Sequence, residues 1–478
     1  MKFRPFPLLL AAILLASCGE SSAPVETTAA DSTDTTTAAE TGLVYEFTED
    51  YGGYEFRILN SEDIYNMHAT IIREEQTGET LNDAMFKRCS TLEEKLNITL
   101  TEDHTAWAGD GVAAKARTSI MAGDDSYDIA FISQPQMVEF AAEGYVYDLM
   151  TMDEMNLDQP WWSKTFNDAN TRSGSLYFAA GYAQLQFIDS LWMLFFNEDM
   201  MTNLKLDMPY DLVRDGKWTL DAYHPYLKAA AQLNGDDSFN WETDKNCIYG
   251  QSGNAIDKYL AGSNEHIIEV VDGKVTLTAG SSHYYDVIDK LLTILTPGDG
   301  CYYGNPDNVS DGQPGNYITM FEDQRALFVC AELSKTNRMR DKSFSYGIVP
   351  FPKYDENQKS YYATPYNNTP AMSIPVTVSD VSRTATIADA LTYLSWDIVL
   401  PVFREVTLEQ KNLRNDDSVE MLGIIIDSVV PSLLSTVSPA LSMLTEVARA
   451  FDTGTNIAAS QLASGKAAID AMLAEINA

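Results

Sequence analysis

Strand and helix patterns alternate in the first part of the chain, and this alternation constrains the fold more than any other feature of the sequence. Residues Tyr54–Asn60 alternate in the manner of a strand, and apolar residues across Leu81–Leu96 recur at spacings of four and three, as on one face of a helix. A short strand at Ile98–Glu102, a helix at Val112–Met121 and a buried strand at Tyr127–Ser133 follow. This order predicts an α/β fold with a right-handed parallel sheet.

The predicted strands also indicate where a ligand would bind. The carboxyl ends of parallel strands meet at one edge of a sheet, and ligands of open α/β sheets bind beyond that edge. Asn60–Asp63 and Ser133–Gln134 follow two of the predicted strands. We therefore expect these polar residues at the binding edge of the first sheet.

The N-terminus has the features of a lipoprotein signal peptide. Lys2 and Arg4 precede an apolar run, Phe6–Ala16, that is shorter than the roughly 20 residues of a membrane-spanning helix but fits the apolar region of a signal peptide. The sequence Leu-Ala-Ser before Cys18 resembles the bacterial lipobox, whose cysteine receives diacylglycerol and becomes the first mature residue. We expect a signal peptide at residues 1–17, lipidation of Cys18 and no later membrane-spanning segment.

Residues 18–43 are expected to form a lipidated, disordered tether. They consist largely of Ser, Thr, Ala, Glu and Asp and contain no aromatic residue, so they cannot bury enough apolar surface to offset the entropy of ordering. A flexible tether of this length spans roughly 25 to 30 Å. It would hold a folded body close to a membrane that the chain does not cross.

Net charge excludes one class of partner. The chain has 32 Lys and Arg against 69 Asp and Glu, a formal net charge of −37, which repels nucleic-acid phosphates. We therefore expect no nucleic-acid partner. The five cysteines include no CxxC pair, so no zinc ribbon is indicated, and one disulfide among the four beyond Cys18 remains open.

Motifs of enzymes and of metal sites are missing from the sequence. No GxSxG, HExxH, GxGxxG or Walker sequence occurs, and the five histidines are scattered. The stretch Asp307–Ile318 resembles a calcium loop, but Val309 and Ile318 stand where oxygen ligands belong. We therefore expect neither enzyme activity nor a cofactor nor a bound metal.

Several stretches, in their order along the chain, resemble the extracellular solute-binding proteins, family 1, of ABC importers, which is the family of the maltodextrin-binding protein. They are the strand and ligand loop YDIAFISQPQ at Tyr127–Gln136, the crossover at Ser175–Asp199, the second-lobe element at Phe321–Ser334, the strand at Ser345–Lys353 and the closing helix at Ser464–Asn477.

The resemblance implies a two-lobe, periplasmic-binding-protein-like (type II) fold, with a central parallel or mixed sheet in each lobe. The hinge would have several crossings, which we expect near Gln186–Leu191, near Thr369–Pro375 and after about Arg414. A chain of 478 residues exceeds what one core usually supports, which agrees with two lobes. The expected boundaries are 44–188 plus 370–414 for lobe I and 189–369 plus 415–478 for lobe II.

The sequence departs from the family pattern in the second lobe. The family's Gly-x-Trp corresponds here to Ala331-Glu332-Leu333, so an expected stacking aromatic is missing and a carboxylate can face the cleft instead. The stretch Val437–Leu444 also offers no aromatic contact of the maltodextrin-binding kind. A long linear maltodextrin is thus a poor first choice of ligand.

Capture of a sugar needs flat apolar faces for its C–H groups and fixed amides or carboxylates for its hydroxyls. The chain supplies 25 Tyr and 7 Trp, and some of these rings stand beside polar side chains in the sequence. The ligand-binding residues that we expect are Asn60, Asp63, Ser133, Gln134, Trp161, Trp162, Tyr182, Gln184, Asp189, Glu332, Tyr366 and Asn367.

These expectations define one functional hypothesis and two alternatives. The hypothesis is a monomeric lipoprotein on the outer face of the bacterial cytoplasmic membrane, which is the periplasmic side if the cell has two membranes. It binds a small solute such as a sugar and delivers it to the permease of an ABC importer. One alternative is a surface glycan-binding or sensor lipoprotein that is not coupled to transport. The other is a glycan-cleaving enzyme, which product analysis on oligosaccharides would reveal.

Overall fold

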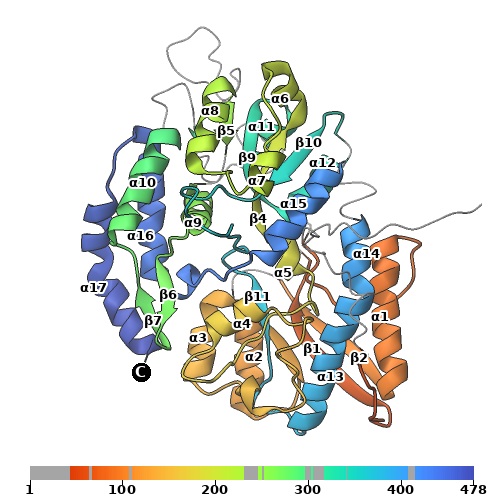
Figure 1. Ribbon diagram of the computed structural model, residues 1–478. Helices are drawn as coiled ribbons and strands as arrows, with labels where there is room; N and C mark the ends of the chain where they lie inside the picture. Colours follow the sequence, from red (N-terminus) through yellow and green to blue (C-terminus); the bar gives the residue numbers. More distant parts are fainter. Residues whose placement is uncertain are drawn as a thin grey trace, which may run out of the picture. The chain divides into compact units, whose positions relative to one another are not determined.

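The structure is a computed structural model, shown in Figure 1. The predicted signal peptide, Cys18 and the tether lie outside the residues that it describes, as do most of the loop Asp307–Ile318 and the side chains of Cys247 and Cys301. The described residues are 44–63, 67–106, 110–230, 246–249, 252–295, 303–304, 317–340, 342–406 and 415–477.

The first sheet contains four strands in the order β11-β3-β1-β2. β1 pairs in parallel with both β2 and β3, so the parallel arrangement predicted from the sequence is confirmed for these strands, while β11 runs antiparallel to β3. We call this sheet and the helices packed on it the first lobe. The strands are β1 (Tyr54–Ser61), β2 (Ile98–Thr105), β3 (Ile129–Ser133) and β11 (Pro370–Ser373).

Helices cover the first sheet by burying apolar side chains against it and against one another. α2 packs against β1 and β3, whereas α1 lies beside β2 and α13, as Figure 1 shows. A π-helical turn at Ser395–Val399 joins α13 to α14, just before Pro401, which lacks the N–H that a regular helix would need there. The helices are α1 (Thr80–Leu96), α2 (Gly111–Ala122), α3 (Gln134–Ala142), α4 (Lys164–Asn170), α13 (Val381–Leu394) and α14 (Leu400–Glu405).

The second sheet contains five strands in the order β10-β4-β9-β5-β8, and a separate hairpin, β6-β7, stands beside it. Every residue of β4 and of β9 is buried, as expected for central strands that are covered on both faces. The strands are β4 (Trp192–Asn197), β5 (Asn246–Tyr249), β8 (Tyr303–Gly304), β9 (Ala326–Glu332), β10 (Tyr346–Val349), β6 (Ile268–Val271) and β7 (Lys274–Leu277).

The second sheet and its helices form the second lobe. α15 packs on β10, α8 packs on β5 and β9, and α16 packs on both α9 and α17. The helices are α6 (Glu198–Leu204), α7 (Tyr210–Arg214), α8 (Leu220–Ala230), α9 (Ser252–Gly262), α10 (Ser282–Leu295), α11 (Tyr317–Glu322), α12 (Thr336–Met339), α15 (Asp416–Asp427), α16 (Ser438–Arg449) and α17 (Ala458–Ile476).

The chain passes between the two sheets more than once. It leaves the first sheet after β3, reaches β4 through the short helix α5 (Gln186–Asp189), and returns as β11 after β10. It leaves again between α14 and α15, where residues 407–414 lie outside the description. These connections fit a fold in which two lobes share several crossings.

One helical run of the described residues, Val381–Glu405, is long and apolar enough to cross a membrane by length and composition. Most of it is buried inside the protein, where α13 packs against α1. We therefore assign it to the core of the first lobe. Two cysteines are also buried in the core, and both Cys89 and Cys330 are free thiols.

Candidate functional site

The edge of the first sheet brings together the ends of β1 and β3, as the strand order predicts. β1 ends at Ser61, and β3 ends at Ser133, from which α3 starts without a loop. Ser61 and Ser133 line one small cavity together with Asn368, which lies just before β11. Ser133 is therefore at the edge where we expect it.

Asn60 and Gln184 are also hydrogen-bonded to one another, but the side chain of Asn60 bonds only to groups of the protein in the described structure. Its side-chain nitrogen donates to Ala69 O and Glu102 Oε1, each at 2.8 Å, and its oxygen accepts from Ser61 N and Gln184 Nε2, also at 2.8 Å. Both residues are buried. The amide of Asn60 is thus fully engaged, whereas Gln184 Oε1 has no partner among the described residues.

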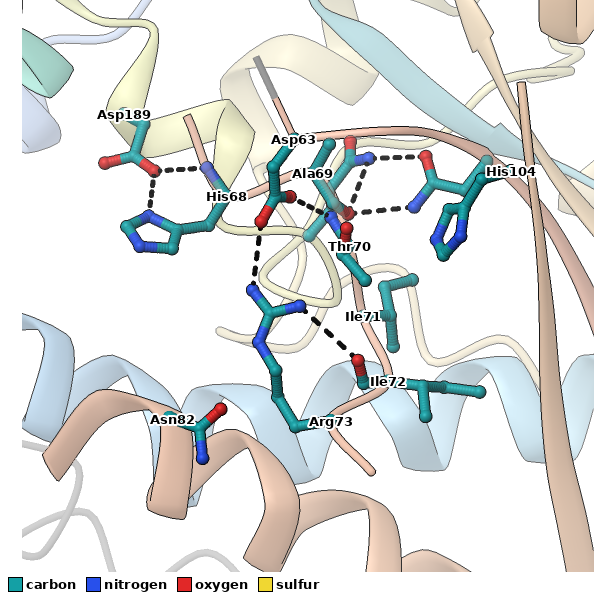
Figure 2. Close-up of polar contacts among 12 residues, drawn as sticks. Asp63, His68, Ala69, Thr70, Ile71, Ile72, Arg73, Asn82, His104 and Asp189 are labelled. Carbon is teal, nitrogen blue, oxygen red and sulfur yellow. Dashed lines mark hydrogen bonds and ion pairs between the residues drawn. The ribbon is translucent and has the colours of Figure 1, made fainter. Parts of the chain in front are cut away.

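The described residues after β1 fold back toward this edge, and Figure 2 shows Asp63 beside Thr70 and Arg73. Asp63 accepts from Thr70 N at 2.6 Å and from the guanidinium of Arg73 at 3.2 Å. The buried carboxylate of Glu102 accepts from the backbone N–H groups of Ile71 and Ile72. Asp63 therefore lies near the edge, but its carboxylate is engaged by Thr70 and Arg73 of the same segment.

Asp189, another predicted site residue, binds His68 in the folded-back segment. Asp189 Oδ2 accepts from His68 N at 2.9 Å and lies 2.7 Å from His68 Nδ1 (Figure 2). Burial alone would lower the pKa of His68, but the charge and hydrogen bond of Asp189 outweigh it, so the pKa is raised. This pair joins the first lobe to α5, the helix that leads into β4.

Gln134, at the start of α3, reaches the second lobe. Its side-chain nitrogen donates to the carbonyl oxygens of Asn367 and Ser432, both at 3.1 Å, in the amide orientation that satisfies its neighbours. Gln134 is 1% exposed and Asn367 is 4% exposed. Two predicted site residues from distant parts of the chain are thus in direct contact.

A buried lysine that the sequence did not single out extends this contact. Lys258 Nζ donates to Asp257 Oδ2 at 2.9 Å, to Pro365 O at 3.0 Å and to Asn367 Oδ1 at 2.8 Å. An ammonium has three donors, and here each of them has an acceptor. Lys258 therefore fixes the segment around Asn367, and the carbonyl oxygen of Asn367 accepts the hydrogen bond from Gln134.

Five buried polar groups near the ends of β4 and β9 have no hydrogen-bond partner within the described part of the chain, and we call them the crossover group. Trp192 and Glu332 stand opposite one another in the ladder, so their side chains share one face. Trp192 N donates to Thr364 O, and α5 contacts the turn that follows β9. The atoms are Gln186 Oε1, Trp192 Nε1, Glu332 Oε2, Ser334 Oγ and Thr364 Oγ1.

Trp161 and Trp162 correct one expectation from the sequence. Their Nε1 atoms both donate to Asp389 Oδ1, at 2.8 and 2.7 Å, and the rings are 5% and 3% exposed. Trp161 also packs against Tyr45 and Tyr393. These two indoles therefore belong to the core of the first lobe and do not face the sheet edge.

Tyr182 and Tyr366 remain partly exposed. Tyr366 N donates to Ser190 O at 2.9 Å, which places this residue beside the crossover group. Burial is the main cause that raises the pKa of Tyr182, which lies near Arg404 of α14 and Asp427 of α15. A ligand can therefore contact either ring without displacing it from the core of a lobe.

The space at the sheet edge is small in this structure. The cavity lined by Ser61, Ser133 and Asn368 has a volume of about 30 Å³. Such a volume holds about one water molecule, whereas ligand pockets usually measure 300 to 1,000 Å³. A sugar can enter this edge only if the contact between Gln134 and the second lobe opens.

Sequence reasoning found part of this site and missed the rest. Strand order led to Ser133 and Gln134, and the departure from the family pattern led to Glu332. Lys258 carries no local signal, because only contacts between distant parts of the chain bring it to Asn367 and the edge. The functional class that these residues could serve is recognition of a polar solute.

Solved structures of other proteins share the fold of this chain. No protein-family model and no curated protein matches the chain, but solved structures do. An ABC substrate-binding protein from Listeria monocytogenes in complex with cycloalternan is 14% identical, with 88% of this chain and 98% of that chain covered and a TM-score of 0.56. The galacto-N-biose-/lacto-N-biose I-binding protein from Bifidobacterium longum is 12% identical over 90% and 99% of the two chains, with a TM-score of 0.57.

A third structure, UgpB from Mycobacterium tuberculosis in complex with glycerophosphocholine, is 12% identical over 88% of this chain and 99% of that chain, with a TM-score of 0.56. At these identities the likeness concerns the fold. The chain has the two-lobe α/β fold of ABC substrate-binding proteins, so the fold that the sequence resemblance implies is confirmed.

Proposed function

We propose that this protein is the solute-binding component of an ABC importer and takes a small polyhydroxy solute, of the carbohydrate class, between its two lobes. Structures that share the fold hold cycloalternan, lacto-N-biose or glycerophosphocholine. These ligands differ in size and charge, but all carry hydroxyl groups. We therefore expect a ligand that carries several hydroxyl groups.

The crossover group is the single observation that carries the proposal. Buried polar atoms in folded proteins nearly always have partners, so five without one in a small region call for an explanation. A hydroxyl both donates and accepts, and so it matches the donor at Trp192 Nε1 as well as the acceptor at Glu332 Oε2. A ligand with several hydroxyls would satisfy the hydrogen-bonding capacity of these five atoms. It would do so more specifically than water or an apolar molecule.

Other residues complete the proposed site. We assign hydrogen bonding at the sheet edge to Ser133, Gln134 and Asn367, and ring contacts with the apolar face of the solute to Tyr182 and Tyr366. Trp161 and Trp162 are left out because they serve the core. Asn60, Asp63, Gln184 and Asp189 would act indirectly, by fixing the segment after β1 against the edge.

The proposed lobes comprise 44–188 plus 370–414 and 189–369 plus 415–478, which agrees with the two sheets. The cavity of about 30 Å³ at the edge requires the lobes to separate before a sugar enters. A solute that contacts both lobes would then favour the closed state through the contacts that only this state offers. A permease could distinguish the two states.

We further propose that the mature chain is a monomer anchored through Cys18 to the outer face of the bacterial cytoplasmic membrane. The support is the sequence of residues 1–43, with its basic start, apolar run, lipobox-like cysteine and polar tether. Metabolic labelling with a fatty acid would test the anchor, because Cys18→Ser should abolish the label. An unlabelled wild-type chain would contradict lipidation.

The binding experiment uses isothermal titration of the purified protein with a panel of mono- and oligosaccharides, glycerol phosphodiesters and amino acids. We expect one polyhydroxy class to bind, with lobe closure visible in X-ray scattering. Glu332→Gln should weaken that binding by about tenfold or more, because the amide replaces one buried acceptor oxygen with a donor. The same variant should keep or raise Tm, since it removes a buried carboxylate oxygen that has no partner.

The matched control is Asp168→Asn, in an exposed pair with Lys164 on α4, which should change neither quantity. Solute binding that Glu332→Gln leaves unaltered would contradict the assigned site. No binding across the panel and no closure would contradict the function and would favour a sensor or adhesion role without transport.

A further inference from the structure

A second and larger pocket lies between the lobes, away from the sheet edge. It has a volume of about 470 Å³, within the range of small-molecule sites. Its apolar lining includes Met137 and Ala141 on α3 together with Tyr177 and Phe178. The N-terminus of α3 faces the proposed solute site through Gln134, so the two sites meet different parts of one helix.

Two tight turns, one from each lobe, bring basic residues to this pocket. Arg172 and Ser175 exchange both backbone hydrogen bonds, at 2.9 Å each, around Ser173 and Gly174, whose φ values are 51° and 87°. Two positive φ values characterise a type I′ turn, which favours glycine at its second position. Arg172 is therefore held rigidly at the start of this turn.

The opposite turn belongs to the β6-β7 hairpin. Asp272 and Gly273 have φ values of 52° and 75°, which again fit a type I′ turn, and Lys274 follows them. A Cβ atom built on Gly273 would lie 3.5 Å from Ser173 N, so the two turns face one another closely. Lys274 lines the same pocket as Arg172.

Arg172 has no counter-ion in the described part of the chain. Its Nε atom is buried without an acceptor, and none of the described carboxylates makes an ion pair with it. Burial lowers the pKa of Arg172 to about 10. Arg57, in contrast, pairs with both Asp125 and Asp128. In a chain with 69 acidic residues, a half-buried arginine that has no carboxylate partner among the described residues is a feature to explain.

We propose that this pocket binds a small organic acid, whose carboxylate pairs with Arg172 and Lys274 while its apolar body packs against Met137, Ala141 and Tyr177. Because both lobes form the walls, the acid stabilises the arrangement in which the lobes are in contact. Binding at the solute site and at this pocket is then positively coupled. The pocket itself does not depend on what the solute site binds.

The test is isothermal titration of the purified protein with benzoate, phenylacetate and hexanoate, each compared with its neutral amide. We expect at least one acid to bind at up to millimolar concentration, and its amide to bind at least about tenfold more weakly. Arg172→Gln should weaken acid binding by about tenfold or more, and Lys274→Gln by less, because Lys274 is exposed. Lys164→Gln, at an exposed lysine of α4, should have no effect.

Three results would overturn the proposal: no binding by any of the acids, equal binding of acid and amide, or acid binding that survives Arg172→Gln in a natively folded variant. If circular dichroism shows Arg172→Gln to be unfolded, Arg172→Lys and Lys274→Gln decide the question. The first should retain most of the acid affinity, and the second should lose part of it. None of these results depends on whether a sugar binds.

Discussion

Asp389, a single buried residue, determines the orientation of two neighbouring indole rings. Its Oδ1 atom accepts from both Trp161 and Trp162, and its Oδ2 atom accepts from Asn156 Nδ2 at 2.6 Å. A pair of tryptophans in a chain with a binding-protein pattern indicates a sugar platform, and the sequence led to that interpretation. The acceptor that turns the rings inward lies more than two hundred residues away, where no local pattern connects them.

We expect Asp389→Ala to lower the free energy of unfolding by about 3 kcal/mol, because the two buried indole N–H groups would lose their acceptor. Differential scanning calorimetry would show this as a lower Tm. Asp168→Ala removes an exposed carboxylate whose partner is the exposed Lys164, so its effect should stay within about 0.5 kcal/mol. Equal shifts in the two variants would refute the structural role of Asp389.

At the scale of helices and strands, periodicity predicted the elements but not all of their pairings. The strands and helices expected between Tyr54 and Ser133 are present, with β2 continuing to Thr105. β11 is only four residues long and has no alternation, yet it completes the first sheet by pairing with β3. A short buried strand forms because it pairs with a distant strand. The local sequence carries no information about that partner.

Close packing of β10 against α7 gives a prediction at this scale. A Cβ atom on Gly347 would lie 2.0 Å from Tyr210 Oη and 2.6 Å from Phe196. Tyr210 cannot move away easily, because its hydroxyl is held by Glu198 at 2.8 Å and by Ser418 at 3.0 Å. Gly347→Ala should therefore destabilise the protein by about 2 to 3 kcal/mol.

The matched control for Gly347 is Gly423 in α15. Nothing lies within 4 Å of a Cβ atom built there, so Gly423→Ala should stabilise the helix by about 0.5 to 1 kcal/mol. Thermal unfolding of the two variants should thus move in opposite directions. A Gly347→Ala variant as stable as the wild type would show that β10 and α7 are packed less closely than described.

At the scale of the whole molecule, the candidate site could be predicted only where one lobe sufficed to define it. Ser133 and Gln134 follow from the rule for parallel strands, and Glu332 from the family pattern. The contact of Gln134 with Asn367, and the role of Lys258, depend on how the chain returns from the second sheet. Such contacts between lobes have no signature in a single stretch of sequence.

The pair of His68 and Asp189 links the lobes through an imidazole whose pKa is raised by the carboxylate. The folded pKa of His68 is raised, so the pair stabilises the protein fully below the unfolded value of about 6.5 and loses this effect as pH rises through the folded pKa. Asp63 and Arg73 also act on His68, with opposite signs. We therefore expect this stabilisation to be present at pH 5.5.

Thermal unfolding at pH 5.5 and pH 8.5 measures this effect. The difference in Tm between the wild type and His68→Gln should be larger at the lower pH. In an Asp189→Asn background, burial is left as the largest influence on the pKa of His68 and lowers it, so the effect of His68→Gln should no longer be larger at the lower pH. A His68→Gln effect that is larger at pH 8.5 would contradict the assigned pair.

The position of β11 in the chain has a consequence for biosynthesis. A ribosome completes β1, β2 and β3 long before it reaches Pro370–Ser373, and it makes the strands of the second sheet in between. Until then, β3 presents an unpaired edge, which is the kind of surface that associates with other chains. Neither lobe can be excised as one continuous fragment, so a nascent chain has to be kept apart from its neighbours until most of it has been synthesised.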